Sequence, residues 1–106
     1  MKRGEIWQAD LGYSGKVRPV LVLSVEYNDD ERAIVTYIPR TTSVWEKSRF
    51  DIPHKVRGMK DGAFAVQLIG SISRSKFLKR TGQVDRDTLI EIETATRNWL
   101  GLSPED

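Results

Sequence analysis

An arginine at the start of an apolar run is the first residue in this sequence that is equipped to do chemistry. Arg18 precedes Pro19 and the run VLVL at 20–23. An arginine at a strand end can keep its planar set of donors in solvent and bind a phosphate through parallel hydrogen bonds. The alternative interpretation is an ordinary solvated charge at the end of a strand.

Hydroxyl side chains follow a second apolar segment, where residues 38–43 read IPRTTS. Thr41 and Thr42 can donate hydrogen bonds to phosphate or ribose oxygens, and Arg40 adds a positive charge beside them. Such clusters also commonly satisfy the backbone of a turn through local side-chain hydrogen bonds. The two segments form one candidate site if their strands pair antiparallel, because the start of one strand then lies beside the end of the next.

The elements that must position these residues are mostly short strands. The hydrophobic pattern predicts strands at 4–11, 19–25, 33–38, 49–52, 63–72 and 79–84, and one helical turn at 73–77. The second strand is apolar enough to be buried on both faces. Pro39 and Pro53 are expected to end the strands before them, and Gly70 predicts a bulge or a close backbone approach.

The C-terminal part of the chain changes to helical periodicity. Asp85 is the predicted N-cap, an apolar stripe runs from Leu89 to Trp99, and Gly101 marks the end. Five or six strands and one terminal helix predict a mainly β fold, a small antiparallel barrel with a C-terminal α-helix packed on it. The length predicts a single domain over 1–106.

Composition limits the kinds of site. The chain has no cysteine, which excludes disulfides, thiolate metal sites and a cysteine nucleophile. No apolar run approaches the roughly 20 residues of a membrane helix, and the N-terminus lacks a signal-peptide pattern, so we expect a cytoplasmic protein. Basic residues gather at 47–60 and 74–80, whereas acidic residues gather at 26–31 and after 85. This separation favours one face that attracts a polyanion, although the same charges also suit solvated loops.

The ordered set of motifs resembles the MazF/PemK family of messenger-RNA interferase toxins from type II toxin–antitoxin systems. The resemblance rests on RGEIW at 3–7, RPVLV at 18–22 with Ser24, Pro39 with Thr41 and Thr42, Gln67, the region 69–77, Gly82 and LGL at 100–102. It covers nearly the whole chain, in the order in which the family carries these motifs. The resemblance implies an SH3-like barrel that forms a homodimer, cleaves single-stranded RNA without a metal or other cofactor, and is neutralised by a cognate antitoxin protein.

The resemblance also implies residue roles. The catalytic arginine of the family falls on Arg18 and its catalytic threonine on Thr41. In the family the ribose 2′-hydroxyl attacks the adjacent phosphorus, leaving a cyclic phosphate and a free 5′-hydroxyl. We expect Arg18 to stabilise the phosphate charge and Thr41 to donate a hydrogen bond to the same phosphate, with the general base unassigned. The further residues expected to contact RNA are Tyr13, Lys16, Arg40, Thr42, Gln67 and Ser71.

Some residues depart from the family pattern or have no role in it. The loop at 12–17 is shorter than in many relatives. If Ser71 takes the place of the family's threonine, Gly70 replaces an arginine, and Arg40 or Arg74 is the candidate to supply the lost phosphate contact. His54, the only histidine, is expected on the surface of a loop.

Two functions of other classes remain open. A barrel of the same architecture can act by binding a protein, as gyrase-poisoning toxins of related fold do, and would not need Arg18 and Thr41 together. A plain nucleic-acid-binding barrel would use basic loops and aromatic side chains without a hydrolytic centre. Trp7 and Trp99 are expected in the core, whereas Tyr13 and Trp45 lie in loops, where they can stack on bases or, for Trp45, anchor a partner protein.

Overall fold

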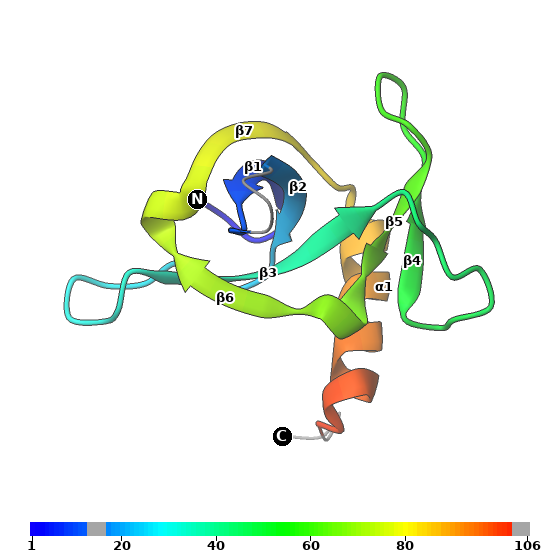
Figure 1. The fold of residues 1–106 in the computed structure, drawn as a ribbon. Helices are drawn as coiled ribbons and strands as arrows, with labels where there is room; N and C mark the ends of the chain where they lie inside the picture. The colour runs from blue at the N-terminus through cyan, green and yellow to red at the C-terminus, as the bar shows by residue number, and fades with distance from the viewer. Residues whose placement is uncertain (13–16, 103–106) are drawn as a thin grey trace.

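The computed structural model describes residues 1–12 and 17–102, which form a mainly β fold with one C-terminal α-helix (Figure 1). The elements are β1 (Glu5–Asp10), β2 (Val17–Val22), β3 (Ile34–Thr41), β4 (Asp51–His54), β5 (Gly62–Ala65), η1 (Val66–Leu68), β6 (Gly70–Ser73), η2 (Arg74–Lys76), β7 (Phe77–Gln83) and α1 (Arg86–Leu100). Neighbouring strands pair antiparallel in the order β4-β5-β3-β2-β1-β7, and β6 also pairs with β3. In Figure 1, β7 curves over β1 and β2 while β3 and β6 pass beneath them, which closes the sheet into the expected small barrel.

The central strand β3 changes partner along its length. One side pairs with β2, and the other side pairs with β6 as far as Tyr37 and with β5 from Arg40 onward. Pro39 lies in the gap between these two partners, where a missing amide hydrogen costs no hydrogen bond on that side. The prediction that Pro39 ends the strand is therefore wrong, and β3 continues to Thr41. Pro53 is likewise tolerated inside a strand because β4 lies at an edge of the sheet.

The long fifth strand expected at 63–72 is also wrong, because the chain turns through η1 and forms two strands. β5 and β6 then pair with different ends of β3. The close approach predicted at Gly70 is confirmed, since a methyl group there would lie 2.7 Å from the hydroxyl oxygen of Tyr37. The helical turn expected after β6 is present as η2.

Two apolar cores lie on opposite faces of β2 and β3. Leu21 and Ile38 belong to the core that α1 covers, whereas Val22 and Tyr37 belong to the core inside the barrel. The second strand is thus buried on both faces, as its continuous apolar run predicted. The double burial lies at residues 20–22 of β2 and at the middle of β3, whereas the start of β2, with Val17 and Arg18, is exposed.

The helix α1 has the predicted ends. The Asp85 carboxylate accepts a hydrogen bond from the Thr88 amide at 2.8 Å, and Gly101 adopts the left-handed conformation at φ 69°. Trp99, expected in the core, is 42% exposed and packs against Phe50 with ring centroids 5.3 Å apart. It therefore lies at the border of the core. Among the described residues, no helix has the length and apolar character that crossing a membrane requires.

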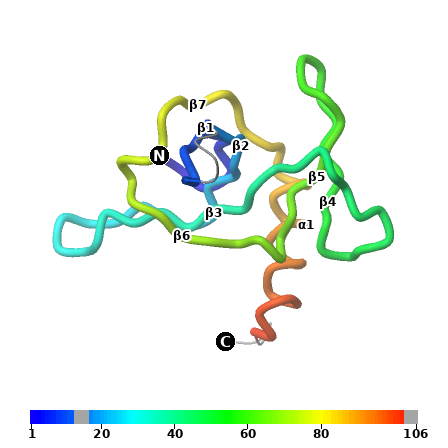
Figure 2. The backbone as a smooth tube through the Cα atoms, viewed as in Figure 1, coloured from blue at the N-terminus to red at the C-terminus, as the bar shows by residue number. Residues whose placement is uncertain are grey.

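Three loops project from the barrel. The loop between β2 and β3 extends to one side, whereas the β3–β4 loop at 42–50 and the β4–β5 loop at 55–61 extend to the opposite side (Figure 2). The last two loops flank the end of β3 and therefore lie next to the candidate hydroxyl cluster.

Candidate active site

The strands β2 and β3 carry Arg18 and Thr41 at the same end of one antiparallel pair. The last residues paired at this end are Val20 and Pro39. Continuing the register by two residues on each strand places Arg18 opposite Thr41. Side chains two residues apart lie on the same face of a strand. Arg18 therefore lies on the face of Val20, Thr41 lies on the face of Pro39, and both side chains leave the same face of the pair. The antiparallel pairing that a shared site requires is therefore present.

Arg18 and Thr41 both have groups free to meet a ligand. Arg18 is exposed, and its side chain forms no hydrogen bond or ion pair with the residues that the structure describes. The Thr41 hydroxyl oxygen accepts a hydrogen bond from the Ser43 amide at 2.9 Å. This hydrogen bond shapes the turn and leaves the hydroxyl hydrogen available to donate to a phosphate oxygen.

A hollow of about 370 Å³ opens beside Thr41. Its lining consists of Thr41, Ser43, Trp45, Asp51, Ala65, Gln67 and Leu68. Gln67, one of the residues expected to contact RNA, lines this hollow together with Thr41. Trp45, also in the lining, is 78% exposed. An aromatic ring together with amide and carboxylate edges is the combination that unstacked nucleobases bind.

Other predicted contacts lie elsewhere. Thr42 lines a separate hollow with Pro53 and Lys55. Ser71 on β6 lies opposite Thr36 on β3, and the two hydroxyl oxygens are 2.6 Å apart. Thr36 is far along β3 from its end, so within one chain the structure does not bring Ser71 to the hydroxyl cluster. Tyr13 and Lys16 lie outside the described residues.

Arg40 points into the protein, so the expectation that it lies exposed beside the hydroxyls is wrong. The residue is 5% exposed, and its Nε donates to Nδ1 of His54 at 2.8 Å. Its Nη2 donates to the carbonyl oxygens of His54 and Lys60, both at 2.8 Å. The reason is the alternation of β3, which sends Arg40 to the face opposite Thr41 and leaves no open side for a phosphate.

His54 is buried, and the expectation of a surface loop residue is wrong. It is 7% exposed within β4, and its ring lies 4.8 Å from that of Phe64 between centroids. Burial lowers the pKa of His54, the Arg40 guanidinium lowers it further, and Asp85 partly offsets both. The signal that reasoning from the sequence missed is the period-two alternation of Phe50, Ile52 and His54, which predicts one buried face.

The comparisons with known proteins agree with this architecture. Residues 2–100 match the sequence profile of a family described as the PemK-like, MazF-like toxin of type II toxin–antitoxin systems. This chain belongs to that family. No curated protein sequence matches it significantly.

Several solved structures share the fold of this MazF-like chain. An endoribonuclease in complex with its cognate antitoxin, from a mycobacterial species, is 23% identical with a TM-score of 0.83 and 97% of both chains covered. The Mycobacterium tuberculosis toxin MazF-mt6 is 24% identical with a TM-score of 0.79, covering 93% of this chain and 98% of that one. A MazE–MazF complex from Deinococcus radiodurans is 20% identical with a TM-score of 0.81 and 97% of both chains covered.

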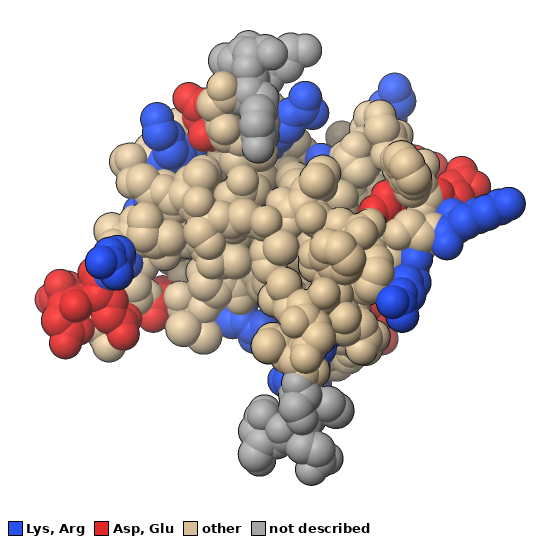
Figure 3. Space-filling model, turned by 60° about the horizontal axis from the view of Figure 1, so that its bottom comes forward, with Lys and Arg blue, Asp and Glu red and all other residues tan. Residues whose placement is uncertain are grey.

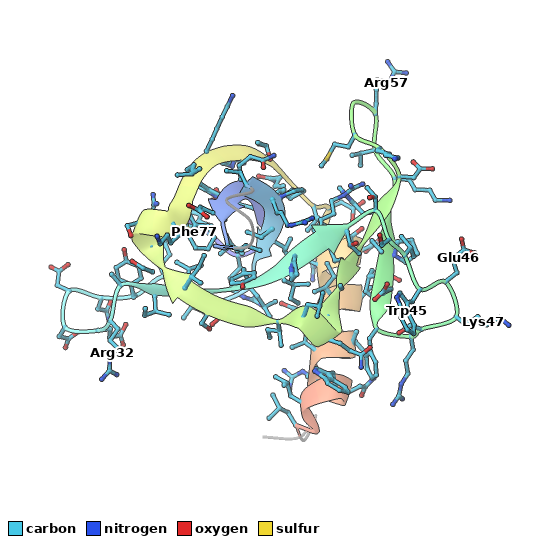
Figure 4. All side chains as sticks on the ribbon, in the orientation of Figure 1. Arg32, Trp45, Glu46, Lys47, Arg57 and Phe77 are labelled. Carbon is cyan, nitrogen blue, oxygen red and sulfur yellow. The ribbon has the colours of Figure 1, made fainter. Side chains whose placement is uncertain are left out.

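The loops of the MazF-like chain differ in charge: the β2–β3 loop is rich in acidic residues, whereas the β3–β4 and β4–β5 loops are rich in basic residues. The acidic residues Glu26, Asp29, Asp30 and Glu31 are all exposed on the β2–β3 loop and form the compact red group at the left of Figure 3. In Figure 4, Arg32 marks this loop, whereas Trp45, Lys47 and Arg57 mark the two loops on the opposite side. The loops on the opposite side carry Lys47, Arg49, Lys55, Arg57 and Lys60 against Glu46 and Asp61. The end of β3 therefore lies on the side that is more favourable for a polyanion.

Proposed function

We propose that this MazF-like chain is the toxin of a toxin–antitoxin pair and a metal-independent, sequence-specific endoribonuclease acting on single-stranded RNA. The observation that carries the proposal is the antiparallel pairing of β2 with β3, whose register, continued by two residues on each strand, puts Arg18 and Thr41 on the same face. Membership of the PemK/MazF family and the likeness to structures described as endoribonucleases support it.

The chemistry has three requirements, and Arg18 and Thr41 supply one of them. The 2′-hydroxyl must lose a proton, the phosphorane must be stabilised, and the leaving oxygen must gain a proton. Arg18 supplies positive charge and paired donors for the phosphorane, since a guanidinium stays protonated at ordinary pH. Thr41 donates a further hydrogen bond to the same phosphate. The base is unassigned, and His54 is unsuited to the role because its ring is buried and its Nδ1 is engaged by Arg40.

The products of an RNA digest test the proposal. Purified protein is incubated with single-stranded RNA in the presence of EDTA, and the ends of the fragments are analysed. We expect cleavage that leaves a 2′,3′-cyclic phosphate and a 5′-hydroxyl, because the neighbouring 2′-hydroxyl, and not water, is the nucleophile that attacks the phosphorus. RNA binding without cleavage would instead indicate a plain nucleic-acid-binding barrel, and neither binding nor cleavage would indicate a protein target.

The partners belong to the same proposal. A homodimer and a cognate antitoxin are expected of this chain, and the antitoxin-bound relatives of the same fold support the second expectation. An acidic, disordered antitoxin segment would suit the basic β3–β4 and β4–β5 loops and would compete with RNA for them. Light scattering on purified protein measures the oligomeric state directly.

Trp45 provides a test of the nucleobase interpretation of the hollow. We expect Trp45→Ala to raise the KM for RNA by about tenfold with little change in kcat, because one stacked base contributes about 1–3 kcal/mol. Folding is expected to be unaffected, since the side chain is 78% exposed. Val25→Ala is the matched control, because Val25 is 74% exposed on the distant β2–β3 loop. An unchanged KM combined with weaker antitoxin binding would make Trp45 a protein anchor instead.

A further inference from the structure

A buried arginine adjoins Thr41 in the chain and connects three parts of the fold. Arg40 on β3 donates to the ring and the carbonyl oxygen of His54 on β4, and also to the carbonyl oxygen of Lys60 in the β4–β5 loop. It forms no ion pair with any carboxylate in the part of the chain that the structure describes. Its contacts are hydrogen bonds to neutral acceptors, and they hold the end of β3 against the β4–β5 hairpin.

The end of β3 has little else to hold it. Beyond Pro39 the strand pairs with β5 through two residues only, Arg40 with Phe64 and Thr41 with Ala63. Gly62 brings the backbones into close approach, since a methyl group there would lie 2.5 Å from the Thr41 carbonyl oxygen. A small shift of the Arg40 side chain would therefore be transmitted to the Thr41 backbone.

We propose that Arg40 is a positioning residue that holds Thr41 in place for RNA cleavage, and that this hold requires an uncharged His54. The inference rests on the proposed function, because Thr41 matters only if the end of β3 is the catalytic site. It gives Arg40 a role through Thr41 in place of direct contact with RNA.

The requirement for an uncharged ring follows from the hydrogen bond. Arg40 Nε–H needs the lone pair of His54 Nδ1, which fixes the ring proton on Nε2. Protonation of Nδ1 would remove that lone pair and would put two cations in contact. The charged groups around the ring are Arg40 from β3 and Asp85 at the start of α1, with Asp61 of the β4–β5 loop acting on Arg40. Asp85 favours the protonated ring, whereas burial and Arg40 oppose it.

The sign of the pH dependence follows from these contacts. Burial and Arg40 lower the pKa of His54 below the ordinary value of about 6.5. The uncharged ring therefore stabilises the fold fully above that value, and this contribution declines as pH falls toward the pKa of the folded protein. Below the folded pKa, the hydrogen bond from Arg40 is lost and cleavage falls with it.

Three variants of the full chain separate positioning from mere stability. Arg40→Met removes the donors and keeps an extended apolar side chain, and we expect kcat to fall between about tenfold and a hundredfold with KM little changed. His54→Asn places an amide oxygen near the Nδ1 position and cannot gain a proton, so we expect cleavage to be retained and the loss in acid to disappear. His54→Leu offers no acceptor and should resemble Arg40→Met.

Amide NMR signals provide a readout that does not depend on RNA. In the unmodified protein, the Thr41 and Ser43 amide shifts should follow the titration of the His54 ring, and in His54→Asn they should not. If the protein cleaves no RNA while these amides still follow His54, the proposed function fails and the hold on Thr41 stands. Amides that ignore the ring, or an Arg40→Met variant with unchanged kcat, would overturn the inference. The comparison of the unmodified protein with His54→Asn remains decisive even if Arg40→Met does not fold.

Discussion

Replacing Arg18 by alanine will reduce RNA cleavage by about 10²–10³-fold, the usual effect of removing one preorganised donor from a developing anion. Arg18 is exposed and forms no hydrogen bond or ion pair with the described residues. Its donors are therefore expected to act on the RNA substrate and not to stabilise the fold. We therefore expect the thermal unfolding temperature to stay unchanged. The measurement is kcat/KM on a single-stranded RNA together with a thermal melt of the same sample.

Two further variants make the Arg18 experiment specific. Arg32→Ala removes an exposed arginine from the β2–β3 loop on the far side of the molecule and should cleave like the unmodified protein (Figure 4). Arg18→Lys keeps the charge and loses the planar pair of donors, so it should recover only part of the activity. Cleavage by Arg18→Ala at the rate of Arg32→Ala would show that the shared end of β2 and β3 is not the catalytic site.

Features that depend on neighbours in the sequence were predicted correctly. The helix α1 begins and ends where its capping residues, Asp85 and Gly101, predict, since each cap acts within a few residues of itself. The burial of β2 on both faces followed from its unbroken apolar run. The antiparallel pairing of β2 with β3, which the candidate site requires, is present.

Features that depend on which strand lies alongside another were not predicted. Pro39 and Pro53 signal a strand end only when both neighbours are present, and β3 and β4 each lack one at that point. The apolar run that contains β5 and β6 contains no turn residue that marks η1. The adjacency of Arg40 and Thr41 in the sequence suggests one cluster, but alternation along a strand sends adjacent side chains to opposite faces. Strict period-two alternation along β3 and β4 places both Arg40 and His54 on buried faces.

Gly62→Ala is expected to destabilise the protein by about 3 kcal/mol, at the upper end of the cost of overpacking a core. The added methyl group would lie 2.5 Å from the Thr41 carbonyl oxygen and 2.8 Å from Nη1 of Arg40. The first of these atoms belongs to the backbone of a paired strand, so it cannot move aside without breaking the β3–β5 ladder. Urea unfolding measures the loss as a lower midpoint at an unchanged slope.

Gly82→Ala is the matched control for this substitution. Gly82 also lies in a strand, β7, but among the described residues no atom outside its two chain neighbours lies within 4 Å of the position that its added methyl group would occupy. That variant should be neutral or up to about 1 kcal/mol more stable, because alanine restricts the unfolded chain. Equal unfolding midpoints for the two variants would mean that β5 does not approach β3 as closely as the structure shows. If Gly62→Ala remains folded and still loses cleavage, the position of the Thr41 backbone, rather than overall stability, limits the reaction.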